Sequence, residues 1–321
     1  MRLRFPSSAI ALIVAFALNA CGGGGGGSNA TQAAPSAEVW KAVGVAINIP
    51  GGAPVLMPEV VVVSPGLFRM YFGQGRTDDG WDIWYAESSD GLGWTVRGIA
   101  LAGTTSPSDP EFIIRGASLV HLASGQWRMY YQAAPTFDQN ASRFYFQTMS
   151  AISSDGVTFA REGVRIANHH FDQSSIFDQA GHARVIQLDS GMYAAYLSGK
   201  LASPNSTGIY LCLSADGLTF QSPTLIVPTG HDPYVVKLSG QYVLYVDTSA
   251  LPNGTFVPEA LLTSADAMTW SAPSTAIFED QTGTQLTQGP DVGGVVMPSG
   301  KLRLFTNYQV GGILSFDRIS P

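Results

Sequence analysis

The chain has 321 residues, a formal net charge of −7, and 45% hydrophobic residues. This length fits a single all-β barrel or propeller with a large core. The acidic balance argues against a nucleic-acid partner, because binding phosphates requires clustered Lys and Arg. There are two cysteines, Cys21 and Cys212, so the fold does not depend on a disulfide if Cys21 is modified.

Residues 1–20 have the pattern of a targeting segment. Arg2 and Arg4 precede an apolar stretch at residues 9–18, which is short for a membrane span. The sequence LNAC at residues 18–21 resembles a bacterial lipoprotein signal. That resemblance implies that Cys21 is lipidated and becomes the mature N-terminus. An ordinary cleaved signal or a short N-terminal anchor is the alternative.

The Gly- and Ser-rich residues 21–36 then form a flexible tether. We expect residues 37–321 to form the folded domain. Two acyl chains or more on Cys21 would hold the protein on a membrane without a spanning helix. The expected location is the bacterial cell envelope, at the outer membrane or its periplasmic face.

From residue 37 onward the apolar runs are short, rich in Val, Ile, Tyr and Phe, and bounded by turn residues, which is typical of β-strands. One element recurs five times, a loop Gly followed by an aromatic or aliphatic strand. Its copies are residues 66–72, 125–131, 191–196, 240–246 and 300–305. Another apolar run precedes each copy.

A second element recurs four times, at residues 88–94, 153–159, 214–220 and 264–270. Its pattern is Ser, a small residue, Asp, Gly or Ala, an apolar residue, Gly or Thr, and an aromatic residue. The Asp side chain can accept hydrogen bonds from the backbone N–H groups of the residues just after it, and Gly tolerates the positive φ that such turns need. We interpret the element, called here the Asp turn, as a tight connection whose aromatic residue anchors the next strand.

Together the repeats predict an all-β, five-bladed β-propeller of four-stranded antiparallel blades. The fifth blade lacks one strand, because the chain ends soon after residue 316. Residues 39–47 are strand-like, and propellers often close by taking a strand from the other terminus. We therefore expect an N-terminal strand to close the ring.

Residues 231–245 resemble the Asp-Pro opening strands of the five-bladed propeller glycoside hydrolases, a group that contains arabinanases, β-xylosidases, invertases and levansucrases. Residues 127–131 and 151–156 resemble the second and third blade strands of the same group. Sialidase Asp boxes match less well, since they have one more residue before the Gly. The resemblance implies carboxylates on the innermost strands that point into a central funnel and cleave glycosidic bonds.

Glycoside cleavage needs one protonated and one ionised carboxyl group on opposite sides of the bond. Four carboxylates stand near the starts of expected inner strands, and we predict them as catalytic: Glu59, Asp178, Asp232 and Asp291. Glu59 and Asp232 form the predicted acid/base pair. Asp232 lies in the fourth unit, whereas the family places its base in the first. An inner-strand Asp that only accepts backbone N–H bonds is the structural alternative.

The predicted substrate contacts are Arg115, His182, Arg184, His231 and Trp81. Trp81 lies in an acidic aromatic loop that could stack on a sugar, although a solvated hairpin tip is the alternative. We predict no metal site and no cofactor. His169 and His170 are adjacent on a loop, an arrangement that rarely binds one ion.

The sequence therefore favours a monomeric, lipid-anchored propeller whose funnel acts on or binds an oligo- or polysaccharide. A non-catalytic propeller that binds a glycan or another protein is the alternative. A purely structural envelope protein would leave the charged strand starts unexplained.

Overall fold

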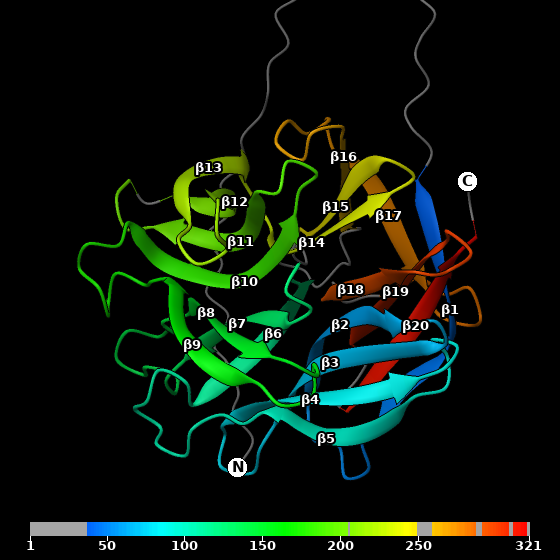
Figure 1. The fold of residues 1–321 in the computed structure, drawn as a ribbon, viewed down its shortest axis with the longest axis horizontal. Coiled ribbons are helices and arrows are strands. Elements are labelled where there is room, and N and C mark those ends of the chain that lie inside the picture. Colours follow the sequence, from blue (N-terminus) through cyan, green and yellow to red (C-terminus); the bar gives the residue numbers. More distant parts are fainter. Residues whose placement is uncertain (1–36, 205, 249–258, 287–290, 308–310, 320–321) are drawn as a thin grey trace, which may run out of the picture.

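The computed structural model describes residues 37–204, 206–248, 259–286, 291–307 and 311–319, and every regular element in these ranges is a β-strand. Within them, no helix is long and apolar enough to cross a membrane. The predicted signal, Cys21 and the tether lie outside the described residues. The strands surround a central axis, with β2, β6, β10, β14 and β18 innermost (Figure 1).

The strands pair in sequence order into antiparallel blades of four. The first blade contains β2 (Val55–Ser64), β3 (Leu67–Gly75), β4 (Trp81–Ser88) and β5 (Thr95–Leu101). The second contains β6 (Ile113–His121), β7 (Trp127–Ala134), β8 (Gln147–Ser153) and β9 (Ala160–Ile166). The third contains β10 (Phe177–Gln187), β11 (Tyr193–Leu201), β12 (Thr207–Ser214) and β13 (Gln221–Val227). The fourth is β14 (His231–Leu238), β15 (Gln241–Asp247), β16 (Glu259–Ser264) and β17 (Ser274–Glu279), and the fifth contains β18 (Val292–Val296), β19 (Leu302–Asn307) and β20 (Gly312–Arg318).

The N-terminal strand β1 (Glu38–Asn48) completes the fifth blade, as predicted. It runs antiparallel to β20, from Trp40 opposite Arg318 to Asn48 opposite Gly312. Its first residues also pair in parallel with β17 of the fourth blade. In Figure 1 the blue β1 and the red β20 lie side by side, so the two ends of the domain close the ring.

The core lies between the blades. Five hydrophobic clusters each combine side chains from two neighbouring blades. Large aromatic side chains dominate them, and Trp40, Tyr71, Tyr130 and Tyr196 are fully buried. Burial of such side chains contributes on the order of 2 kcal/mol or more each, so the clusters hold the ring of blades together.

The Asp turns connect each blade to the one before it. In the first turn Asp90 accepts the backbone N–H groups of Leu92 and Gly93, and the Ser88 hydroxyl accepts that of Gly91. The same pattern recurs in the other three turns. Backbone N–H donors lower the pKa of Asp216 and Asp266 to about 2.

The aromatic strand of the preceding blade binds each turn. Tyr71 and Tyr130 donate their hydroxyls to the carbonyls of Gly156 and Gly217, at 2.5 and 2.8 Å. Tyr196 does the same with Ala267. The aromatic residue that ends each turn packs edge-on against the same strand, with centroid distances of 5.7–6.0 Å.

The fifth blade has no Asp turn, and β1 supplies a substitute. Trp40 packs edge-on against Tyr245 of the fourth blade at 6.3 Å. The Tyr245 hydroxyl donates to Glu38 at 3.0 Å. The first residues of β1 therefore replace both the aromatic contact and the hydroxyl acceptor that an Asp turn provides elsewhere.

Deletion of residues 38–48 should abolish cooperative unfolding, because it opens the ring, removes Trp40 and exposes the hydrophobic side chains that pack around Trp40. Thermal unfolding followed by circular dichroism and by tryptophan fluorescence tests this. Removal of residues 22–36 is the matched control and should leave the transition intact. A variant without residues 38–48 that melts like the parent protein would show that β1 does not close the ring.

Candidate functional site

A β-bulge interrupts the inner strand of each of the first four blades. The pairing register shifts between Leu56 and Glu59, and at the equivalent points of β6, β10 and β14. One residue in each bulge has positive φ: Met57, Gly116, His182 and Asp232, at 50–66°. Bulges turn a side chain away from the regular pleat, and positive φ at a non-Gly residue stores strain often found at functional sites.

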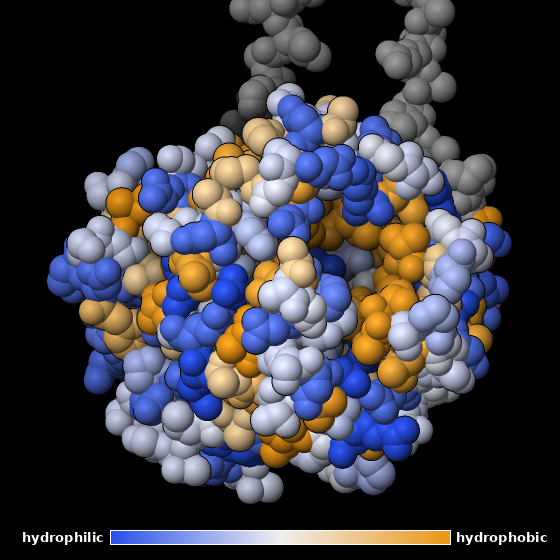
Figure 2. Space-filling view, in the orientation of Figure 1, coloured by the Kyte–Doolittle hydropathy of each residue, from blue (hydrophilic) through white to orange (hydrophobic). Residues whose placement is uncertain are grey.

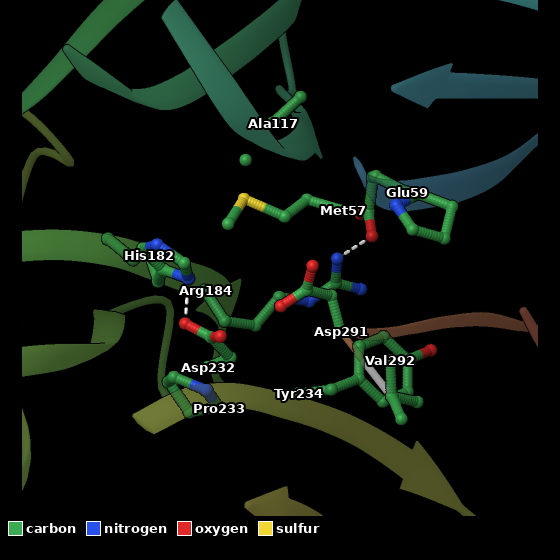
Figure 3. A pocket seen from close by; sticks show the side chains of 13 residues that line it. Met57, Glu59, Ala117, His182, Arg184, Asp232, Pro233, Tyr234, Asp291 and Val292 are labelled. Carbon is green, nitrogen blue, oxygen red and sulfur yellow. Dashed lines mark ion pairs between the residues drawn. The ribbon is translucent and has the colours of Figure 1, made fainter. Parts of the chain in front are cut away.

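The bulges create a ring of side chains around the axis, shown in Figure 3. They enclose a small cavity, lined by Met57, Pro58, Glu59, Gly116, Ala117, His182, Ala183, Arg184, Asp232, Pro233, Tyr234, Asp291 and Val292. Five of the nine predicted catalytic or substrate-binding residues therefore meet here. They come from four different blades.

Asp232 lies between two histidines. His182 Nδ1 pairs with one carboxylate oxygen, and His231 Nδ1 lies 2.9 Å from the other. His231 also lies 3.8 Å from Asp247 at the end of β15. Burial lowers the pKa of His182 well below its usual range, and the charges of Arg115 and His231 act in the same direction. His182 is therefore suited to donate a neutral N–H to Asp232.

Asp291 completes this group from the start of the fifth blade. One side-chain ligand atom from each of His182, Asp232 and Asp291 lies within 4.8 Å of the other two. Burial raises the pKa of Asp291, while the charges of Arg115 and His231 oppose that effect. Asp291 is therefore easier to protonate than an exposed aspartate.

Glu59 lies deeper and is 2% exposed. It forms an ion pair with Arg184 and accepts the backbone N–H of Leu119 at 3.4 Å. The Arg184 guanidinium crosses the centre of the ring in Figure 3 and lies 4.6 Å from the Tyr234 ring centroid. Glu59 and Arg184 thus neutralise each other and close the floor of the site.

Arg115 lies beside the ring, between two aromatic side chains. Its guanidinium is 5.0 Å from the Trp81 ring and 5.4 Å from the Phe146 ring. Burial lowers the pKa of Arg115, and the charge of Asp291 opposes this effect. Trp81 is partly buried under Arg115 and does not line the central cavity, so its ring is not the solvated hairpin tip considered above.

Asp178 does not join the other carboxylates. It lies on β10 four residues before the bulge, where Arg143 contacts it at 2.8 Å and Lys200 at 3.2 Å. The Arg143 hydrogen bond lowers its pKa, with help from Lys200. Asp178 therefore pairs with two cations that favour its ionised form, which suits it poorly to proton transfer.

The sequence pattern of charged inner-strand starts did not predict the carboxylate Glu259. It begins β16, the third strand of its blade, and is 1% exposed. Within the part of the chain that the structure describes, its Oε1 has no hydrogen-bond partner. Burial raises the pKa of Glu259 well above its usual range, and the nearby charges of Asp247 and Asp291 raise it further. A charged residue at the start of an otherwise apolar strand was the available sequence signal.

Two overlapping groups of side chains could hold a metal ion by geometry: His182, Asp232 and Asp291, and His231, Asp232 and Asp247. Both contain residues that already contact each other. Among the described residues His169 and His170 belong to neither group. His169 Nδ1 lies 2.7 Å from the Ser175 carbonyl, and His170 stacks on Tyr145 at 3.9 Å.

A larger cleft adjoins the ring and shares His182 and Asp232 with it. The central cavity, about 40 Å³, is small for a ligand, whereas the cleft has about 740 Å³ and lies within the range of about 300–1,000 Å³ typical of ligand pockets. It extends over the second, third and fourth blades. On the face shown in Figure 2, a separate hollow rimmed by hydrophobic residues lies right of centre, near the place where Figure 1 labels β14 and β18.

No protein-family model and no curated protein matches the sequence. Solved structures do match. A family 117 glycoside hydrolase of the marine bacterium Zobellia galactanivorans is 16% identical, with a TM-score of 0.63 over 88% of this chain and 90% of that one. An α-L-arabinofuranosidase from Lactobacillus brevis is 17% identical, with a TM-score of 0.62 over 86% and 93%.

A family GH43 β-1,3-galactosidase, solved with galactodeoxynojirimycin, is 14% identical, with a TM-score of 0.63 over 87% and 94%. At such identities the likeness concerns the fold. The chain has the β-propeller fold of these glycoside hydrolases, as the resemblance of its strands implied.

Replacement of Glu259 by Gln should remove a pH dependence of stability. A Glu in the unfolded chain ionises near pH ~4.3, whereas the folded protein keeps Glu259 protonated to higher pH. Above this pH the folded state therefore binds more protons than the unfolded state, and the free energy of unfolding falls as pH rises above about 4.3. Chemical denaturation from pH 5 to 8 should show a flatter profile for Glu259→Gln, and the exposed Asp79→Asn control should follow the parent. Parallel profiles for all three proteins would contradict a protonated Glu259.

Proposed function

We propose that the chain is a glycoside hydrolase that cleaves its substrate at the mouth of the central ring, with Asp232 and Asp291 as the reacting carboxyls. The observation that carries the proposal is their convergence: their nearest oxygens lie within 4.8 Å, at the point where the ring meets a cleft of sugar-binding size. The fold shared with several glycoside hydrolases supports the same substrate class.

The two carboxyls have different surroundings, as the reaction requires. Asp291 has a raised pKa and would donate a proton to the leaving glycosidic oxygen. Asp232 contacts His182 and His231, whose N–H groups suit an ionised carboxylate. Their short separation is closer to the ~5–5.5 Å of retaining enzymes than to the ~6.5–9.5 Å of inverting ones.

In such a retaining reaction Asp232 would attack the anomeric carbon and form a glycosyl ester as the leaving group takes the Asp291 proton. Asp291, then ionised, would accept a proton from water as that water hydrolyses the ester. The histidines would hold Asp232 in position throughout. Glu59 takes no part in this scheme, because its partner Arg184 already neutralises it. This replaces the Glu59 and Asp232 pair expected from the sequence.

A non-catalytic carbohydrate-binding propeller is the second candidate. One observation favours it: Arg184 crosses the ring and closes its floor. In that case the cleft would bind a glycan, and Asp232 and Asp291 would serve as hydrogen-bond acceptors for hydroxyl groups.

A screen of aryl-glycosides and plant or algal polysaccharides tests the proposal. Conversion of Asp232 or Asp291 to Asn should lower the rate on the best substrate by about a thousandfold, since each change removes a reacting group. Glu59→Gln should act mainly on stability, and Lys237→Gln, far from the ring, is the control. Equal product traces from the parent and both Asn variants would exclude this pair. Binding without hydrolysis would favour the non-catalytic propeller.

We further propose that Cys21 anchors the protein to the cell envelope. The LNAC sequence and the tether that follows it support this. In a bacterial host, the parent protein should take up labelled palmitate and sediment with membranes. The Cys21→Ser variant should lose the label. Equal labelling of both proteins would contradict lipidation at Cys21.

A further inference from the structure

The cleft beside the ring carries an unusual charge distribution. Its lining contains two cationic side chains, Arg143 and Lys200, besides His182 and His231, and one carboxylate, Asp232. The protein as a whole has 24 acidic and 17 basic residues. A cleft with more basic than acidic groups therefore differs from the average surface of this chain.

Arg143 and Lys200 share a single carboxylate. Arg143 Nη1 donates to Asp178 Oδ2 at 2.8 Å, and its Nη2 donates to the Asp178 carbonyl at 2.6 Å. Lys200 Nζ lies 3.2 Å from the same Oδ2. Arg143 also stacks on Tyr145 at 4.9 Å, so its position is fixed. One negative charge thus faces two positive charges.

Lys200 is the less constrained of the two cations. Its side chain is 34% exposed, against 26% for Arg143, and Asp178 is the one ion-pair partner found for it among the described residues. Asp138, the other carboxylate on this side, accepts the N–H groups of Asn140 and Ala141 and the hydroxyl of Tyr145. The Lys200 ammonium is therefore available to a ligand.

Arg115 adds a second cation near the same cleft. It lies against Phe146, which lines the cleft, and its buried Nε has no hydrogen-bond partner among the described residues. In the described part of the chain no carboxylate forms an ion pair with Arg115. Burial of a guanidinium is costly, and the charge of Asp291 offsets this cost for Arg115 only in part. Its planar donors are suited to a carboxylate or a sulfate.

We propose that the cleft selects sugars that carry an anionic substituent, either the carboxylate of a uronic acid or a sulfate ester. Lys200 supplies the main contact at the wall shared with Asp178, and Arg115, which contacts Phe146 and does not itself line the cleft, adds positive charge nearby. This inference rests on the proposed function, because it names the substrate class of the same site. A carboxylate and a sulfate ester both carry a negative charge and oxygen acceptors, and these are the features that the cations recognise.

Isothermal titration with three matched trisaccharides tests the inference: galactotriose, a sulfated galactotriose and trigalacturonic acid. The protein used is the full folded domain with its tether, carrying Asp291→Asn so that no probe is hydrolysed. One of the two charged probes or both should bind about tenfold more tightly than the neutral one at low salt. The preference should shrink as salt is added, because salt screens exposed charges.

Two substitutions should move this preference in opposite directions. Lys200→Gln should reduce the preference for the charged probe about fivefold, since it removes the main cationic contact while Arg143 still neutralises Asp178. Asp178→Asn should increase the preference for the charged probe, because Arg143 and Lys200 both lose their shared carboxylate partner. A purely structural role of these residues would not produce opposite changes. Lys237→Gln, which contacts Asp189 on the surface, is the matched control.

The outcomes separate this inference from the proposed function. Equal binding of neutral and charged trisaccharides, unaffected by Lys200→Gln, would overturn the anionic preference and leave carbohydrate binding intact. Tighter binding of only the sulfated or only the carboxylated probe would support the inference and identify the group. No binding of any probe, together with no turnover by the parent protein in the glycoside screen, would overturn both.

Discussion

The contact between each aromatic strand and the Asp turn of the next blade is the interaction on which this structure depends. A blade cannot bury both of its faces alone, so its stability comes from its neighbours. Tyr71, Tyr130 and Tyr196 donate to turn carbonyls of the following blade, and the aromatic residue of each turn packs back on the donor strand. Because a tyrosine hydroxyl is buried in each contact, loss of the acceptor would leave an unpaired polar group. The contact therefore fixes the spacing of the blades as well as their association.

This outer scaffold allows the inner strands to deviate from regular geometry. Bulges at Met57, Gly116, His182 and Asp232 interrupt the pleat where the strands pass closest to the axis. Strain of about 1–3 kcal/mol at a positive-φ residue persists only when the surrounding packing is secure. The blades supply that packing, and the bulges turn His182 and Asp232 toward Asp291. The site is thus built from residues of separate blades on a rigid frame.

The charged groups at and beside the centre form three sets. The floor is neutral because Glu59 and Arg184 pair, the ring combines Asp232 and Asp291 with two histidines, and the adjoining cleft holds more cations than carboxylates. Glu259 is buried, and the charges of its acidic neighbours Asp247 and Asp291 add to the effect of burial in raising its pKa.

The sequence alone determined the fold: the Asp turns at residues 88–94 and their copies, the five aromatic strands and the strand at residues 39–47 gave the blade count and the closure of the ring. Repeats are local patterns, and strand periodicity can be read without knowing what each strand contacts. The sequence also placed His182, Asp232 and Asp291 at inner-strand starts. Only the tertiary structure decided their partners. Arg184 neutralises Glu59, and Arg143 and Lys200 pair with Asp178, while Glu259 is buried near Asp247 and Asp291. The protonation and availability of a carboxylate depend on neighbours brought together by folding, and no local pattern encodes them.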